Sequence, residues 1–122
     1  MGILSYRDLR VWQAAMDLVE WVYRESGPFP QREVYGLSSQ MRRSAVSIPS
    51  NIAEGHTKES TKEYLRHLSM AQGSLSELQT LIEIAARLQY LTPDQSGGLM
   101  DQTVSLARQM YALRNALLKQ SP

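Results

Sequence analysis

The sequence predicts an all-α protein, an antiparallel up-down-up-down four-helix bundle. Apolar residues recur at steps of three and four along four long stretches, which is the period of an amphipathic helix. Capping residues, prolines and glycines separate these stretches, and the connections are short, as between antiparallel neighbours in a bundle. A chain of 122 residues is an ordinary size for one domain, so we treat residues 1–122 as a single bundle.

The first helix is expected over about residues 6–26. Its apolar residues fall on one helical face: Leu9, Trp12, Met16, Val19 and Tyr23. Ser5 and Asp8 are both possible N-caps, and Gly27-Pro28 is a stop signal.

The second helix is expected over about residues 38–54, with Ser38 as its N-cap. Gly55 would end it by adopting the left-handed conformation. Pro49 lies well inside the helix, where it removes one backbone hydrogen bond, so we predict a kink at Pro49. Two separate helices broken at Pro49 are the less favoured alternative.

The third helix is expected over about residues 61–91. Ser60 and Glu63 match a capping box at its start. Gly73 weakens the middle of the helix, so a close approach of a neighbouring backbone is expected there.

The fourth helix is expected over about residues 93–119. Thr92 is its N-cap, Pro93 occupies the first helical position, and Gln95 completes a second capping box.

One stripe of the second helix is neither an ordinary surface, which would carry Lys and Glu, nor an ordinary core, which would carry Leu. Most of its side chains are short and polar, and antiparallel pairing brings two polar residues of the third helix level with them. We predict a partly buried polar seam, in which Arg43 pairs with Glu77. The seam comprises Gln40, Arg43, Ser47, Asn51, Glu54, Ser74 and Glu77, with Ser44 and Ser50 on the same stripe.

The opposite side of the second helix carries a wide apolar arc, which leaves little surface for water. In a monomeric bundle every helix keeps an outer face, so this arc favours self-association. The candidates for a subunit interface are Val46, Pro49 and Ala53.

Composition excludes several classes of protein. The absence of cysteine rules out disulfides, thiolate zinc sites and cysteine nucleophiles. The N-terminus lacks the features of a signal peptide, and no apolar run approaches the roughly 20 residues that span a bilayer. We therefore expect a soluble, cytoplasmic protein with no membrane partner.

The sequence contains no catalytic or metal-binding motif that we recognise. Di-iron bundles use Glu-x-x-His pairs, but the residue three before His56 is Ala53, and Tyr64 holds that place before His67. His67 is expected to pair with Glu63 on the helix surface, and His56 to be solvated. We predict no enzyme, no catalytic residue, no cofactor and no metal.

Nucleic acid is a possible partner. The net charge is only +1, but residues 31–70 carry six basic against four acidic residues. The candidate contacts are expected to lie around the hairpin between the second and third helices. They are Arg42, Lys58, Lys62 and Arg66. The alternative is an ordinary solvated helix face, on which Glu59 or Glu63 pairs with the basic residue three positions later.

Several motifs carry a resemblance to a known family, over positions 6–78 and in order. They are Tyr6-Arg7-Asp8-Leu9 with Trp12-Gln13-Ala14-Ala15; Phe29-Pro30, Glu33 and Tyr35-Gly36-Leu37; Gln40 with Arg42-Arg43-Ser44-Ala45; Ser47-Ile48 with Asn51-Ile52-Ala53-Glu54-Gly55; and Gly73-Ser74-Leu75 with Glu77-Leu78. The chain resembles the four-helix bundle proteins first noticed as products of intervening sequences within 23S ribosomal RNA genes.

This resemblance implies a cytoplasmic homo-oligomer, expected to be a pentameric ring. It also implies a fold related to the accessory variability determinant proteins of diversity-generating retroelements, which are linked to nucleic acid and to a reverse transcriptase. The family has no established enzymatic activity. The expected function is a non-enzymatic module associated with RNA or a ribonucleoprotein; the alternative is a scaffold for a partner protein such as a reverse transcriptase, without nucleic-acid binding of its own.

Overall fold

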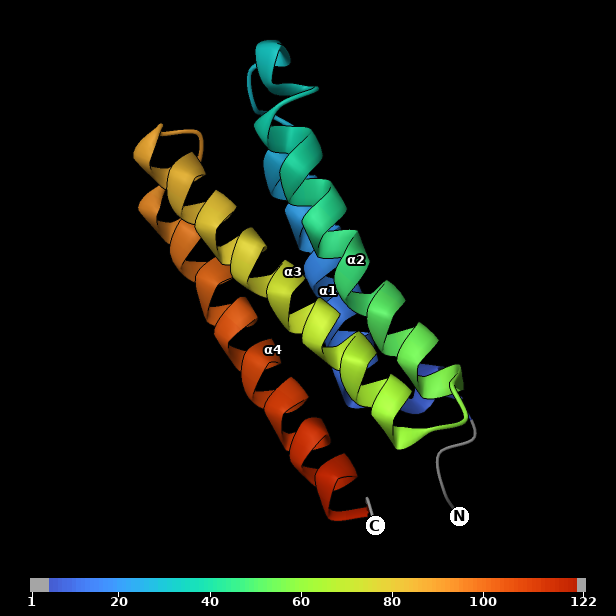
Figure 1. Ribbon diagram of the computed structural model, residues 1–122. Helices are drawn as coiled ribbons and strands as arrows, with labels where there is room; N and C mark the ends of the chain where they lie inside the picture. The colour runs from blue at the N-terminus through green and yellow to red at the C-terminus, as the bar shows by residue number, and fades with distance from the viewer. Residues whose placement is uncertain (1–4, 121–122) are drawn as a thin grey trace.

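The computed structural model describes residues 5–120, which form a bundle of four α-helices (Figure 1). The helices are α1 (Arg10–Ser26), α2 (Leu37–Thr57), α3 (Thr61–Arg87) and α4 (Pro93–Gln120), with 3₁₀ turns η1 (Tyr6–Asp8) and η2 (Gln31–Glu33). Residues 5–120 contain no strand, and the predicted all-α four-helix bundle is confirmed. None of the helices in this range is long and apolar enough to cross a lipid bilayer.

Each helix packs against two others: α2 lies between α1 and α3, and α4 closes the bundle against α3 and α1. Side-chain contacts give the directions, because Ser47 of α2 meets Ser74 of α3 whereas Asn51 meets His67. The partner's number falls as the α2 number rises, so these two helices run in opposite directions. Figure 1 shows that η1, the α2–α3 turn and the end of α4 lie at one end of the molecule.

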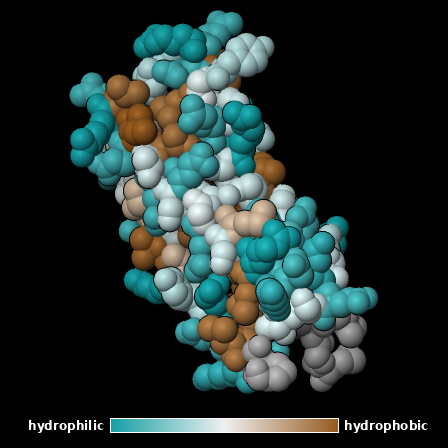
Figure 2. All heavy atoms as spheres, in the orientation of Figure 1, coloured by the Kyte–Doolittle hydropathy of each residue, from teal (hydrophilic) through white to brown (hydrophobic). Residues whose placement is uncertain are grey.

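The core is built from aliphatic side chains of all four helices. Those that are fully buried include Leu18, Met41, Ile48, Ile52, Leu68, Leu78, Ile82, Leu99, Leu106 and Met110. Polar residues cover much of the outside. On the face drawn in Figure 2, hydrophilic side chains gather over the α2–α3 turn and hydrophobic ones near the α3–α4 turn.

The start of α1 differs from the prediction. Leu9 has an extended backbone (φ −74°, ψ 125°) that separates η1 from α1, so the helix begins at Arg10 and not near residue 6. Ser5 does act as a cap, but for η1, where its hydroxyl accepts from the Arg7 amide at 3.1 Å.

The start of α2 is capped by Glu33 and not by Ser38, which lies inside the helix and is buried. The Glu33 carboxylate accepts a 3.1 Å hydrogen bond from the backbone N–H of Leu37 and a 2.9 Å bond from the hydroxyl of Tyr90. The bond from Leu37, followed by that from Tyr90, lowers the pKa of Glu33 below its ordinary value. A carboxylate at a helix N-terminus also interacts favourably with the helix dipole.

The predicted end of α2 at Gly55 is wrong, because the helix continues to Thr57 and Gly55 does not have a positive φ. The glycine serves the packing instead. A Cβ atom at position 55 would lie 2.9 Å from His67 Cβ and 2.9 Å from Tyr64 Cδ1. The α2 backbone therefore approaches α3 more closely here than any other residue would allow.

The helix α2 also passes through Pro49 without interruption, so it is not two separate helices. The kink that we expect at Pro49 remains a prediction.

The third helix ends at Arg87, four residues before the predicted end, and Gln89 then turns the chain with φ 63°. The expected close approach at Gly73 is wrong, since a Cβ placed there would meet nothing within 4 Å. The capping box of α4 is confirmed: the Thr92 hydroxyl accepts from the Gln95 amide at 3.1 Å, and the Gln95 side chain accepts from the Thr92 amide at 2.8 Å.

Candidate functional site

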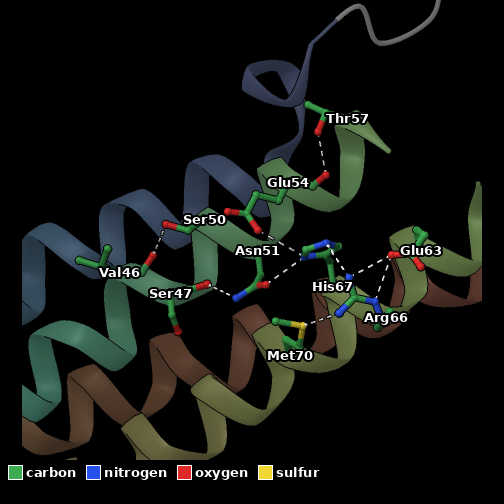
Figure 3. A network of polar contacts seen from close by, with 10 residues as sticks. All are labelled: Val46, Ser47, Ser50, Asn51, Glu54, Thr57, Glu63, Arg66, His67 and Met70. Carbon is green, nitrogen blue, oxygen red and sulfur yellow. Dashed lines mark hydrogen bonds and ion pairs between the residues drawn. The ribbon is translucent and has the colours of Figure 1, made fainter. Parts of the chain in front are cut away.

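The polar seam between α2 and α3 is organised around a buried histidine (Figure 3). The residue His67 is only 5% exposed and projects from α3 towards α2. Its Nδ1 atom lies 3.1 Å from Asn51 Oδ1 and 3.6 Å from Glu54 Oε2. The seam residues Asn51 and Glu54 are thus brought together on His67. The predicted surface pair of His67 with Glu63 is wrong, because His67 is buried against α2.

The hydrogen-bond network assigns the histidine tautomer. The Asn51 side-chain nitrogen donates to the Ser47 carbonyl at 2.8 Å, which leaves Asn51 Oδ1 as an acceptor. Therefore His67 Nδ1 carries the proton and donates it. The other ring nitrogen, Nε2, faces Nη2 of Arg66 at 3.5 Å and accepts. Both ring nitrogens are thus satisfied inside the protein.

The network continues outwards to the surface of α3. The Arg66 guanidinium lies 3.0 Å from Glu63 Oε2, and its Nη1 lies 3.5 Å from Met70 Sδ. The hydrogen bond and the positive charge of Arg66 lower the pKa of Glu63. For Arg66, the structure therefore matches the alternative to nucleic-acid binding, a solvated helix face on which Glu63 pairs with the basic residue three positions later.

Further along the seam, the hydroxyls of Ser47 and Ser74 are hydrogen-bonded to each other, and Ser47 also donates to the Ser44 carbonyl at 3.0 Å. The predicted pair between Arg43 and Glu77 is wrong: no ion pair joins them among residues 5–120. Both side chains are exposed. With Gln40, Ser44 and Ser47 they line an open hollow of about 290 Å³.

The four candidate basic contacts do not form one cluster. The Arg42 side chain packs at the opposite end of α2 from the α2–α3 turn and caps the end of α1. It donates to Ser26 Oγ at 2.9 Å and to the Tyr23 carbonyl at 3.3 Å, with its Cζ atom 4.7 Å from the centroid of the Tyr23 ring. A cation beside the last carbonyls of a helix is stabilising, so the position of Arg42 indicates a structural role.

The other three candidates, Lys58, Lys62 and Arg66, lie together at the α2–α3 turn and are exposed. Within the described part of the chain neither lysine forms an ion pair, whereas Arg66 is paired with Glu63.

The three candidate interface residues lie on one open hollow of about 320 Å³ between α1 and α2. It is lined by Tyr6, Trp12, Met16, Val19, Val46, Pro49, Ser50 and Ala53. The side chain of Pro49 is buried, whereas those of Val46 and Met16 are each 40% exposed. The side chains around the hollow are mostly apolar.

Sequence reasoning missed two features of the seam. The first is the burial of His67, which its spacing to Glu63 does not reveal, although its position one residue before Leu68 on the apolar spine is a signal.

The second is the buried hydroxyl of Tyr64, which has no hydrogen-bond partner in the described residues. Its burial raises the pKa of this hydroxyl. No group of three or more His, Asp or Glu side chains in residues 5–120 is placed to hold a metal ion.

The fold and this seam define the class of protein: a four-helix bundle whose second and third helices share a polar seam centred on a buried histidine. The chain belongs to the 23S rRNA-intervening sequence protein family, whose model matches residues 7–112. The resemblance seen in the sequence is thereby confirmed.

One solved structure, a crystal structure of a protein with unknown function from the S23 ribosomal protein family of Bacteroides thetaiotaomicron, is similar in fold. Its TM-score is 0.77 at 19% sequence identity, and the similarity covers 85% of this chain and 97% of that chain. A comparison with curated protein sequences found no match.

Proposed function

We propose that this protein is a non-enzymatic, homo-oligomeric module that associates with RNA or with a ribonucleoprotein. The observation that carries the proposal is the pair of exposed lysines at the α2–α3 turn, Lys58 and Lys62, whose ammonium groups have no ion-pair partner within residues 5–120. Such groups are available to neutralise phosphates. The name of the matched family mentions 23S rRNA, and the similar solved structure is assigned to a ribosomal protein family. Both names support RNA or a ribonucleoprotein as the partner.

The seam supports a non-enzymatic role. The polar groups at its centre satisfy one another: Ser47 with Ser74 and Ser44, Asn51 with Ser47 and His67. A nucleophilic serine needs a general base within hydrogen-bond reach, and the one histidine of the seam donates its Nδ1 proton to Asn51. The seam residues are therefore better explained as helix-to-helix contacts.

The hollow around Val46, Pro49 and Ala53 supports self-association, because burying it against a second copy would remove apolar side chains from water. The same surface also suits the second candidate function, a scaffold for a partner protein such as a reverse transcriptase, with no RNA contact.

RNA binding across a salt series separates the two functions. We expect the purified protein to bind a fluorescein-labelled single-stranded RNA, with log K falling linearly as log salt rises between about 50 and 200 mM. No binding at about 50 mM salt would reject the RNA module and leave the scaffold. Light scattering of the same sample tests the oligomer, which we expect to be a pentamer; a monomer would contradict it.

A further inference from the structure

The two ends of the bundle differ in charge, although the whole chain is nearly neutral. The end that holds the α2–α3 turn, η1 and the end of α4 carries seven basic residues: Arg7, Arg10, Lys58, Lys62, Arg66, Arg114 and Lys119. The same end carries four acidic residues, Asp8, Glu54, Glu59 and Glu63, which gives a net charge of +3.

The opposite end, around η2 and the α3–α4 turn, carries five basic residues: Arg24, Arg32, Arg42, Arg43 and Arg87. It carries six acidic residues, Glu20, Glu25, Glu33, Glu83, Asp94 and Asp101, for a net charge of −1. The charge asymmetry therefore arises only on folding, because three segments far apart in the sequence meet at one end (Figure 1).

The basic side chains at the first end are mostly not used in ion pairs. Of the seven, Arg66 alone has a carboxylate partner in the described range. The side chain of Arg114 donates to Ser69 Oγ at 3.2 Å, which ties α4 to α3. At the other end the structure uses Arg42 to cap α1 and pairs Arg87 with Glu83 at 3.0 Å.

Aromatic rings adjoin the basic end as well. The rings of Tyr6 and Trp12 meet edge to face with centroids 5.2 Å apart, and Arg7 lies 5.6 Å and 5.7 Å from their centroids. Both rings are only half-buried. Basic side chains beside aromatic rings are common where proteins bind single-stranded nucleic acid without a sequence preference. Because Tyr6 and Trp12 also line the hollow proposed for self-association, the basic side chains, and not the rings, carry the proposal that follows.

We propose that a single-stranded RNA binds across this end of the bundle, held through its phosphates by basic residues of η1, α1, the α2–α3 turn and α4. The proposal rests on the RNA association proposed above and gives it a surface: four of the seven basic residues were not among the candidates drawn from the sequence. It also excludes Arg42, which was one of them.

A matched pair of triple variants tests the location. The first, Arg10→Gln with Lys58→Gln and Lys62→Gln, removes three charges from the basic end. The control, Arg24→Gln with Arg43→Gln and Arg108→Gln, removes three exposed charges elsewhere, so both variants have the same net charge. None of these six side chains forms an ion pair within residues 5–120, and both variants should melt like the wild type.

With a labelled single-stranded RNA, the basic-end triple should bind about tenfold or more weakly at low salt. Its salt slope should fall by about 2, at about 0.7 for each lost phosphate contact. The control should keep the wild-type slope. Equal losses in both triples, or an unchanged slope in the basic-end triple, would overturn the location while RNA association stands. Absence of binding by the wild type would overturn both proposals.

Discussion

The α2–α3 seam and the basic end of the bundle meet at the α2–α3 turn, but their polar groups are used differently. In the seam, Asn51, His67 and the serines are matched with one another. At the end, Lys58 and Lys62 extend into solvent. The comparison teaches that the most unusual part of the sequence has a structural explanation. The residues available to bind a partner are exposed lysines such as Lys58 and Lys62, which look in the sequence like an ordinary solvated surface.

This difference predicts two separate kinds of variant. Changes at the hydrogen-bonded groups of the seam, such as Asn51 and His67, should lower stability and leave RNA affinity per folded molecule unchanged. Changes at the basic end should do the reverse, because exposed charges contribute little to stability.

The largest effect is expected at Gly55. Changing Gly55→Ala places a methyl group 2.9 Å from both His67 and Tyr64, so the helices must move apart. We expect a net loss of about 2 kcal/mol in the free energy of unfolding, measured by urea denaturation. The matched control is Gly73→Ala, where the new methyl meets nothing within 4 Å and better helix propensity should add up to about 1 kcal/mol. Equal effects at both positions would contradict the close approach.

The next effect concerns the Asn51–His67 contact. Truncating either side chain to alanine leaves a partly buried polar group unpaired, which should lower stability by about 1–1.5 kcal/mol, the lower part of the range for such groups. A double-mutant cycle should give a coupling of about 1 kcal/mol. The exposed pair Glu83–Arg87 is the comparison and should give only about 0.3–0.5 kcal/mol. A seam coupling no larger than that of the surface pair would mean that the histidine network adds little.

The smallest effect at neutral pH is expected for Glu33. Because its pKa is lowered in the folded state, its stabilising contribution is present above the ordinary carboxyl pKa of 4.5 and is lost as the pH falls through the lowered value. The Glu33→Gln variant should be less stable than the wild type near pH 7, and the difference in thermal melts should shrink as the pH falls below 4.5 and through the lowered pKa of Glu33. Glu59→Gln, which removes an exposed carboxylate with no hydrogen bond in the described range, should not show this convergence. A constant difference between wild type and Glu33→Gln at all pH values would contradict the role of the charge.

Local signals in the sequence were enough to predict the four helices. The capping box at Thr92 and Gln95 formed as expected, and the Ser60 hydroxyl accepts from the Glu63 amide at 3.1 Å. These motifs involve residues three positions apart, so they can be recognised without knowing the fold. The Asn-Ile-Ala-Glu-Gly run also pointed to the right family.

Features that depend on contacts between distant residues could not be predicted. The cap of α2 involves Glu33 and Tyr90, which are 57 positions apart. Glycines at positions 55 and 73 look alike in sequence, yet only Gly55 faces a neighbouring helix. Likewise, Arg42 and Lys58 are both basic residues, near opposite ends of α2, but a backbone carbonyl at the end of α1 engages Arg42 alone.

The most direct test of the difference between seam and end is to crosslink bound single-stranded RNA with ultraviolet light and identify the attached peptides by mass spectrometry. We predict crosslinks in residues 6–12, 56–66 and 114–120, which meet only in the folded bundle. Crosslinks concentrated around Arg42 and Arg43, or at the α3–α4 turn, would contradict the account.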